Sequence, residues 1–255
     1  MTAPNPARVY DYALGGCHNF TVDREFMERA ELAFPGAKQG ARANRAFLGR
    51  AVHWLVGAGI RQFLDLGSGI PTLGNVHEVA EWSVPDARVM YVDIDPVAVA
   101  HTRAMLAGHP HVGVLQADLR RPAEIIGHPD VRYLLDFHAP MAVIMSSVLH
   151  FIPDADDPFT IVAQLRNAIV PGSYIALSHG SPPPERLAEY ETLRKLVRQT
   201  PASFHPRSRE QIARLLEGLE LVEPGLVPVA DWHPDRDEDA SSYVSSLLAA
   251  VGRKP

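Results

Sequence analysis

One stretch constrains this chain more than any other: an apolar strand that runs into a tight glycine turn at 62–71 (Gln-Phe-Leu-Asp-Leu-Gly-Ser-Gly-Ile-Pro). The apolar spacing of Val76, Val79 and Ala80 predicts a helix directly after the turn. Glycines at such a turn let the backbone pass close to a ligand where a side chain would collide. Because a strand, a Gly-x-Gly turn and a helix begin a nucleotide-binding βαβ unit, this stretch predicts an α/β fold with a ligand at the turn.

Strands and helices alternate along most of the chain after this turn. Runs of apolar and β-branched residues predict further strands at 88–92, 112–117, 142–146 and 173–178. Helices are predicted at about 96–106, 158–169, 183–199 and 208–217. Proline interrupts a strand-like segment at 219–229, and 243–251 fits either a last strand or a helix. This order predicts a mostly parallel sheet with helices on both faces.

The residues before the first strand are helical in pattern and predict an N-terminal cap. Three helices are expected, at 7–14, about 23–35 and about 38–57. Three arginines flank the apolar stripe of the third helix and are expected to form a solvated face: Arg42, Arg45 and Arg50. We therefore predict a helical cap over 1–57 and an α/β body over 58–255 that form one structural unit.

The composition limits the kind of protein further. With 255 residues, 46% hydrophobic and 21% charged, the chain is long enough for a large core and ordinary for a globular protein. A formal net charge of −6 offers no basic field to nucleic acid. The single cysteine, Cys17, excludes an intramolecular disulfide and a multi-cysteine zinc site. Since no long apolar run and no signal-peptide core occur, we expect a cytoplasmic protein with no membrane or nucleic-acid partner.

Three aspartates stand at the ends of three successive predicted strands: Asp65, Asp93 and Asp118. In such sheets ligands bind at the carboxyl ends of the strands, near the switch point. A carboxylate after the second strand can accept two hydrogen bonds from a ribose diol, and a polar residue after the third can meet the amino edge of adenine. A turn or cap role would explain any one of them, but all three in order indicate a nucleotide-like ligand.

Two adenosine-containing cofactors fit this pattern, NAD and S-adenosylmethionine. A dinucleotide fingerprint requires a glycine three residues after Gly69, but Thr72 holds that position. Pro71 has no N–H to offer a phosphate. Asp65 would repel a pyrophosphate but suits the cationic amino-acid end of S-adenosylmethionine. The residues therefore favour S-adenosylmethionine and disfavour NAD-dependent redox chemistry.

Several segments resemble the motifs of class I S-adenosylmethionine-dependent methyltransferases, namely 63–69, 91–96, 116–119 and 147–154. Two more resemble an actinobacterial "S-adenosyl methyltransferase" family long catalogued as a domain of unknown function, namely 6–16 and 43–48. The resemblance implies a Rossmann-like, seven-stranded sheet whose last strand is antiparallel. Pro71 departs from the wider superfamily, where glycine is common, and leaves the path of the loop open.

The resemblance also implies roles for individual residues. The two glycines of the turn would line the methionine moiety, Asp93 the ribose, and Asp118 with Leu119 the adenine. Ser146 would face the ligand from the end of the fourth strand. Independently of the resemblance, Tyr12 and Asn19 border the Gly15-Gly16 turn and could close over the cofactor, although packing explains Tyr12 equally well. The predicted cofactor-binding residues are Tyr12, Gly16, Asp65, Gly67, Ser68, Gly69, Asp93, Ile94, Asp118, Leu119 and Ser146.

Two histidines are candidates for catalysis. Methyl transfer depends mainly on alignment, and a base helps when the acceptor must lose a proton. His150 follows the fourth strand and His179 follows the fifth, so each is a possible base, although a structural role fits either. No metal is expected: Asp154, Asp156 and Asp157 are close together in the sequence after the fourth strand, but Asp157 is better used as a helix cap.

We therefore predict a methyltransferase that acts on the oxygen or nitrogen of a small molecule and releases S-adenosylhomocysteine. A specialised metabolite as acceptor is a family analogy alone. The alternative is a non-catalytic regulatory module that binds S-adenosylmethionine or S-adenosylhomocysteine. The sequence specifies neither the acceptor nor the oligomeric state.

Overall fold

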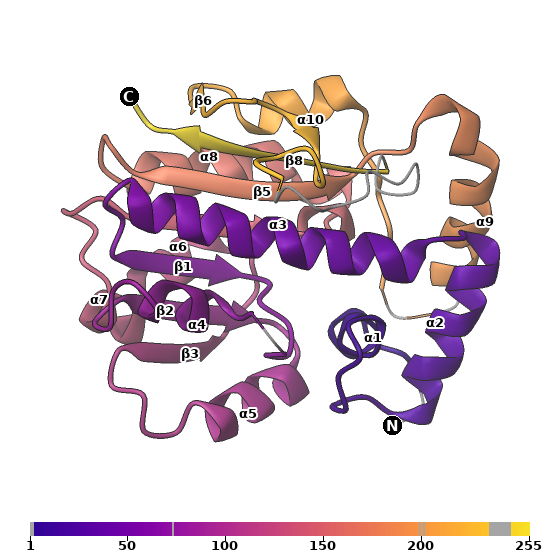
Figure 1. The fold of residues 1–255 in the computed structure, drawn as a ribbon, viewed down its shortest axis with the longest axis horizontal. Coiled ribbons are helices and arrows are strands. Elements are labelled where there is room, and N and C mark those ends of the chain that lie inside the picture. The colour runs from indigo at the N-terminus through magenta and orange to yellow at the C-terminus, as the bar shows by residue number, and fades with distance from the viewer. Residues whose placement is uncertain (1–2, 73, 199, 201, 235–245) are drawn as a thin grey trace.

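A mostly parallel sheet forms the centre of the structure (Figure 1). The structure is a computed structural model that describes residues 3–72, 74–198, 200, 202–234 and 246–255. Within these residues the strands are β1 (Gln62–Leu66), β2 (Arg88–Asp93), β3 (Val112–Gln116), β4 (Ala142–Ser146), β5 (Tyr174–Gly180), β6 (Glu220–Leu221), β7 (Val227–Pro228) and β8 (Leu247–Arg253). Their order is β3-β2-β1-β4-β5-β8-β6, and β7 also pairs with β8. β1 to β5 run parallel and β8 runs antiparallel to β5, which confirms the predicted α/β class.

The last part of the sheet differs from the seven strands that we expected. The described residues form eight strands because the segment at 219–229 contributes two pieces, β6 and β7, both paired with β8. Pro224 and Gly225 lie between the pieces, and Pro228 has no N–H to donate to a partner strand. At the chain end the strand alternative is confirmed by β8, whereas residues 243–245 of that prediction lie outside the described residues.

Helices cover both faces of the sheet. They are α1 (Pro6–Ala13), α2 (Thr21–Ala33), α3 (Ala37–Gly57), α4 (Val76–Glu81), α5 (Pro96–Met105), α6 (Pro122–Gly127), α7 (Pro129–Leu134), α8 (Pro158–Ala168), α9 (Leu187–Val197) and α10 (Arg209–Leu215). Short 3₁₀ helices span Leu149–Phe151, Asp154–Asp156 and Pro184–Arg186. No helix in the described part of the chain is long and apolar enough to span a membrane.

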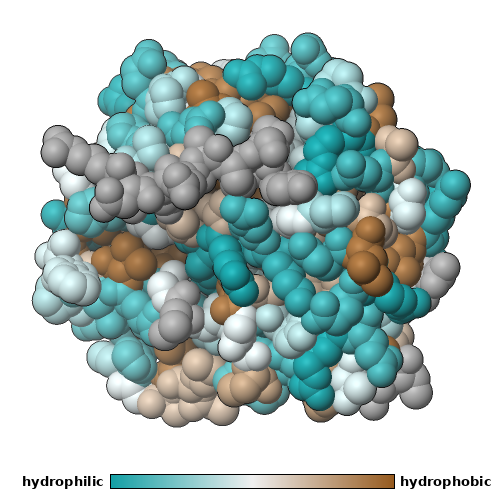
Figure 2. Space-filling model, turned by 45° about the vertical axis from the view of Figure 1, so that its right-hand side comes forward, coloured by the Kyte–Doolittle hydropathy of each residue, from teal (hydrophilic) through white to brown (hydrophobic). Residues whose placement is uncertain are grey.

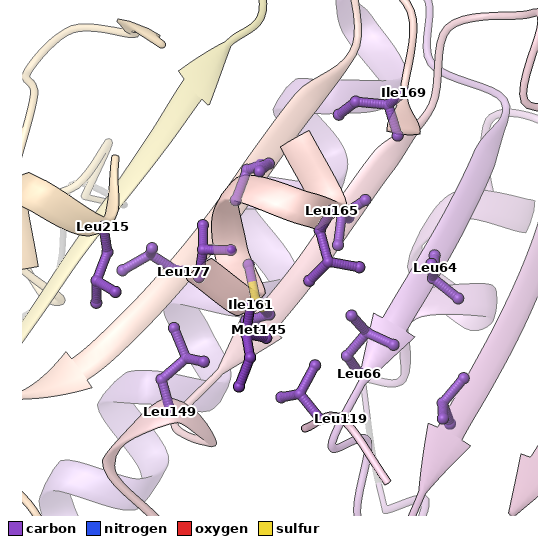
Figure 3. Packing of buried hydrophobic residues seen from close by; sticks show 14 of the residues in the cluster. Leu64, Leu66, Leu119, Met145, Leu149, Ile161, Leu165, Ile169, Leu177 and Leu215 are labelled. Carbon is purple, nitrogen blue, oxygen red and sulfur yellow. The ribbon is translucent and has the colours of Figure 1, made fainter. Parts of the chain in front are cut away.

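Alternation along the strands divides the core into two layers. Leu64 and Leu66 of β1 face α8, and Figure 3 shows them in the same cluster as Ile161 and Leu165 of that helix. Phe63 of β1 faces the opposite way and packs in the layer under α3 and α4. The sheet is therefore buried on both sides, which leaves its strand ends as the place for polar chemistry.

The N-terminal helices occupy the carboxyl end of the sheet. α1 and α2 lie beyond the arrowheads of β1 and β2, next to α9 (Figure 1). A small apolar cluster joins Val9 of α1, Phe26 of α2 and Val197 of α9. α3 extends from this group back across the sheet, where its Phe47 and Leu55 are buried. The region predicted as a cap thus contains two helices beyond the strand ends and a third that belongs to the sheet core.

Helix starts follow the local sequence closely. The Asp95 carboxylate accepts a hydrogen bond from Val97 N (3.0 Å) at the start of α5, with Pro96 in the first turn. Ser208 forms a capping box with Gln211 at α10. The Asp157 carboxylate caps α8 through Thr160 N (3.1 Å). The predicted cap at Asp157 is confirmed, and all three helix starts depend on residues within one turn.

The face of the molecule that Figure 2 shows is mostly polar, with scattered apolar residues. Singly exposed apolar side chains are normal on a folded protein. The polar surface is consistent with the two buried layers, which take up most of the large apolar side chains.

Candidate functional site

The glycine turn closes onto the end of β2. Gly67 N and Ser68 N both donate to the carbonyl oxygen of Val92, at 2.8 and 3.2 Å. Gly69 N donates to Asp93 Oδ2 at 2.7 Å. The turn and Asp93 are therefore one hydrogen-bonded unit at the switch point between β1 and β4, where such sheets bind ligands.

Two glycines make this turn possible. Gly67 has φ of +71° and Gly69 has φ of +66°, in the left-handed region that favours glycine. A Cβ on Gly67 would lie 2.2 Å from Cγ2 of Val148. The turn therefore requires glycine at Gly67 for its backbone angle and for the close approach of Val148.

Asp93 keeps acceptor capacity beside an apolar side chain. Its Oδ1 accepts from Asp95 N at 2.8 Å, so each oxygen accepts one backbone N–H and retains a second lone pair. Burial raises the pKa of Asp93, and the backbone hydrogen bonds oppose that effect. Ile94 follows directly and is 56% exposed, unusual for a large apolar residue next to a buried carboxylate. This pair fits a ribose diol with a flat ring beside it.

Asp65 is a buried carboxylate without a hydrogen bond in the described part of the chain. It is 5% exposed at the end of β1. Burial raises its pKa to about 7, Arg45 acts to lower it and Asp93 to raise it. A buried carboxylate that has no partner fits a ligand that carries a cation.

Asp118 lies just after β3 and forms an ion pair with Arg120, which also pairs with Asp156. Arg120 Nε donates to Oδ1 and Oδ2 of Asp118 at 3.0 and 2.9 Å, and Arg120 Nη1 reaches Asp156 at 3.2 Å. Burial acts to raise the pKa of Asp118, but hydrogen bonds from Arg120 lower it overall. The neighbouring Leu119 side chain packs in the core beside Leu66 (Figure 3), so only its backbone is available to a ligand.

A polar network joins the N-terminal helices to the ends of β4 and β5. Asn44 Nδ2 donates to Ser146 Oγ (3.0 Å) and to the hydroxyl of Tyr10 (2.9 Å). The Ser178 hydroxyl donates to Asn44 Oδ1, and Ser147 N donates to Ser178 Oγ at 2.9 Å. Asn44 is 1% exposed, so this network fixes α1 and α3 over the site.

We expect Asn44→Ala to destabilise the protein by about 2–4 kcal/mol, because it leaves buried hydroxyls without partners. For a chain of this length the melting temperature should fall by roughly 5–10 °C. Differential scanning calorimetry would measure it, with Arg42→Ala on the exposed side of α3 as control. A decrease no larger than that of the control would refute this role for Asn44.

The two candidate histidines have different environments. His179 Nδ1 donates to the carbonyl of Gly180 at 2.8 Å, and its Nε2 accepts from Arg207 Nη1 at 2.9 Å. Burial lowers the pKa of His179 to about 4. His150 Nδ1 accepts from Gly180 N at 3.3 Å, and its Nε2 has no hydrogen bond to a described residue. Burial, followed by His179 and Arg207, lowers the pKa of His150 well below its usual value. The contacts favour a structural role for His179 and leave a ring nitrogen of His150 for a ligand.

Two predicted residues of the N-terminal turn have local partners. The Tyr12 hydroxyl donates to Glu28 of α2 at 2.7 Å, so its ring lies against α2. A Cβ on Gly16 would lie 2.1 Å from Oδ1 of Asp11, which is buried. Asp11 Oδ2 accepts from His18 N at 2.9 Å and holds the turn closed. Among the contacts described, Tyr10 rather than Tyr12 is connected to the strand ends, through Asn44.

Sequence reasoning missed several residues of this site. Of the three arginines expected on a solvated face, only Arg42 is exposed. Arg50 donates to the carbonyls of Trp232 and Val229, and Arg45 donates to the Thr72 hydroxyl on the glycine loop at 2.8 Å. Asn44 and Arg45 lie in the segment 43–48, and the resemblance of this segment to the family was the sequence signal that could have identified them.

Acidic side chains near the site have protein partners. Asp154 accepts from Arg207 Nη2 at 2.7 Å, and Asp157 caps α8. Among the described residues, no three His, Cys, Asp or Glu side chains are grouped so that they could hold a metal ion.

The site and fold together define a class of protein. A free buried carboxylate, Asp93 with spare acceptors and the exposed Ile94 fit a cofactor with a cation, a ribose and a flat ring. The N-methyltransferase NodS from Bradyrhizobium japonicum WM9, solved with S-adenosylhomocysteine, shares the fold with a TM-score of 0.55 at 15% identity, over 97% of this chain and 99% of its own. The structure is thus a Rossmann-like class I methyltransferase fold, as predicted.

The family follows from the sequence comparison. The chain belongs to the S-adenosyl methyltransferase family, whose model matches residues 1–255. S-adenosylmethionine is accordingly its cofactor, as predicted.

Two solved structures are similar over nearly the whole chain. A proposed methyltransferase from Thermobifida fusca YX is 42% identical, covers 100% of this chain and 96% of its own, and has a TM-score of 0.92. A protein of the DUF574 family from Streptomyces avermitilis MA-4680 is 36% identical, covers 99% of this chain and 98% of its own, and has a TM-score of 0.94. No curated protein matches.

Proposed function

We propose that this protein transfers the methyl group of S-adenosylmethionine to an oxygen or nitrogen of a small molecule that binds beside His150. The observation that carries the proposal is the free ring nitrogen of His150 at the carboxyl end of β4. Aromatic rings surround it, Phe151 at 4.5 Å and Phe204 at 5.0 Å between ring centroids. Aromatic surroundings of this kind suit a small, partly apolar acceptor.

Different residues would have different roles in the reaction. S-adenosylmethionine supplies a methyl group activated by a sulfonium. Asp93 and the glycine turn would hold the ribose and methionine parts, and the network around Asn44 would keep α1 and α3 over them. Holding both partners in line can contribute up to about 7–11 kcal/mol to the rate. Alignment is therefore the main contribution of this chain.

His150 would orient the acceptor rather than remove a proton from it. Because Nδ1 accepts from Gly180 N, the proton of the neutral ring is on Nε2, which can donate a hydrogen bond to the acceptor. Its lowered pKa keeps the ring neutral at ordinary pH and makes it a weak base. We therefore propose that His150 donates a hydrogen bond to the acceptor, in place of the base that the sequence predicted.

Transfer of labelled methyl groups tests this function. The protein is incubated with methyl-labelled S-adenosylmethionine and the low-molecular-weight fraction of an actinobacterial extract, and labelled products are separated and identified. A labelled small molecule is the expected result. Tight binding of S-adenosylhomocysteine without labelled product in any fraction would favour the regulatory module instead.

We expect His150→Phe to lower kcat/KM for the identified acceptor by roughly 10–100-fold, since one hydrogen bond to a polar group is lost. At saturating S-adenosylmethionine, where ionisation of Asp65 in the free protein does not affect the rate, the pH profile of the wild type should show no histidine-like step between about pH 6 and 8, because His150 is already neutral there. Steady-state assays would measure both, with exposed His53→Phe as control. Unchanged kcat/KM in His150→Phe, or a step near pH 6.5 that the variant loses, would contradict this role.

A further inference from the structure

Arg207 is a buried arginine whose contacts surround His150. It is 2% exposed. Its Nη1 donates to the carbonyl oxygen of Leu149 and its Nη2 to that of Ile152, both at 2.9 Å. Leu149 and Ile152 lie on either side of His150 in the chain, at the two ends of the short 3₁₀ helix that carries it. The guanidinium therefore fixes this 3₁₀ helix at both ends.

The main chain beside this guanidinium holds the residue that orients the His150 ring. Gly180 N donates to His150 Nδ1 at 3.3 Å, and Gly180 O accepts from Arg207 N at 3.1 Å. His205 N donates to the carbonyl oxygen of His150 at 2.7 Å. Residues 205–207 therefore hold both the backbone of His150 and the glycine that fixes the direction of its ring. The ring nitrogen that remains, Nε2, is the one assigned to the acceptor.

The other two hydrogen bonds of the Arg207 guanidinium also come from its Nη atoms. Nη1 donates to His179 Nε2 at 2.9 Å, and Nη2 donates to Asp154 Oδ1 at 2.7 Å. The Asp154 side chain is 70% exposed, so solvent weakens the one ion pair that is described for Arg207. The planar guanidinium nevertheless provides a rigid fork of donors that can bind two carbonyls at once, whereas lysine has a single ammonium on a flexible stem. Arg207 thus contributes a geometry that a lysine at this position would lose.

We infer that Arg207 is a positioning residue for methyl transfer, which holds the His150 ring so that its Nε2–H meets the acceptor. This inference rests on the proposed contact between His150 and the acceptor. None of the contacts described for Arg207 reaches the glycine turn or Asp93, so its effect should be confined to the acceptor side of the site. Misplacing a bound group by about 1 Å can slow a reaction by about 100-fold. Loss of the fork should therefore slow transfer and leave cofactor binding unchanged.

Arg207→Lys removes the fork and keeps the positive charge. Two quantities are measured: the initial rate of product labelling, with methyl-labelled S-adenosylmethionine and the low-molecular-weight fraction of the actinobacterial extract, and the affinity for S-adenosylhomocysteine by calorimetry. We expect the rate to fall by roughly 10-fold, and by no more than in His150→Phe, and the affinity to change by less than about twofold. Arg209→Lys is the control, because Arg209 also donates to a backbone carbonyl, that of Leu226, and this variant should change neither quantity.

A double-mutant cycle with His150→Phe separates positioning from a general structural role. If Arg207 acts through His150, Arg207→Lys should lower the rate by less than about twofold in the His150→Phe background. A residue that only stabilises the fold would slow both backgrounds by the same factor. Should melting curves show that Arg207→Lys does not fold, Asp154→Asn removes the ion pair at Nη2 instead, and we expect a roughly 2–5-fold loss of rate that also depends on His150.

The outcomes separate two failures. If the wild type labels no small molecule, the proposed function fails and the positioning role fails with it. If the wild type is active but the folded variant has an unchanged rate, loses rate equally in both backgrounds, or loses rate together with affinity for S-adenosylhomocysteine, the proposed function stands and the role of Arg207 is refuted. A loss of rate that requires His150 and leaves cofactor affinity unchanged supports the inference.

Discussion

Replacing Gly67 with alanine should destabilise the protein by about 2–5 kcal/mol, whereas Gly74→Ala should cost about 1 kcal/mol. The two glycines have nearly the same backbone angle, φ of +71° and +73°. A Cβ on Gly67 would lie 2.2 Å from Val148, while a Cβ on Gly74 would have no described atom within 4 Å. The difference between the variants therefore isolates the close approach of β1's turn to the chain after β4. Urea denaturation of both variants would measure it.

A double-mutant cycle identifies the cause of that difference. If the methyl group that Gly67→Ala adds collides with Val148, then Val148→Ala should cost less in the Gly67→Ala background than in the wild type, with a coupling of about 1–3 kcal/mol. Additive effects would show that Val148 moves aside without strain, and the large cost at Gly67 would then need another explanation.

The parts of the site that could be predicted are those encoded within one strand and its turn. Gly67 and Gly69 follow β1 directly, and Asp93 ends β2, so strand periodicity and turn chemistry are enough to place them at one edge. The hydrogen bond from Gly69 N to Asp93 then follows from the pairing of β1 with β2.

The contribution of the N-terminal helices could not be predicted in the same way. Asn44 contacts Ser146, which is 102 positions away in the chain, and Arg50 contacts the carbonyls of two residues that are 182 and 179 positions away. An arginine that flanks an apolar stripe has the same local pattern whether it faces water or a carbonyl. Only the path of α3 across the sheet determines whether such an arginine is exposed to water or donates to a buried carbonyl.

The histidines illustrate the same limit for chemistry. His150 and His179 each follow a parallel strand in the predicted order, so the sequence makes them equal candidates. They differ because Arg207, 28 positions after His179, donates a hydrogen bond to Nε2 of His179. A distant partner thus separates a structural histidine from one with a free nitrogen.

Asp65→Asn should make the ligand-free protein more stable at pH 8, by up to about 4 kcal/mol. The pKa of Asp65 is about 7 in the folded protein, against 3.8 in the absence of burial. Between these values the folded state binds more protons than the unfolded state, so the Asp65 contribution to stability falls as the pH rises from about 4 to 7. Above pH 7 the full cost of the buried charge is present, and asparagine removes it. Of the charged groups nearby, Arg45 reduces this cost and Asp93 increases it.

The same substitution should weaken the cofactor complex, because asparagine has no charge to offer the α-ammonium. Wild-type affinity for S-adenosylhomocysteine should rise with pH between about 6 and 8 as Asp65 ionises, and that of Asp65→Asn should be nearly flat. Urea denaturation at pH 5 and pH 8 and calorimetry at pH 6 and pH 8 would measure the two effects, with Asp86→Asn as a control. Parallel stability profiles for Asp65→Asn and the wild type would show that Asp65 does not carry this cost. Opposite changes in stability and affinity are expected because an unpaired buried carboxylate destabilises the free protein and becomes favourable only when the ligand supplies its cation.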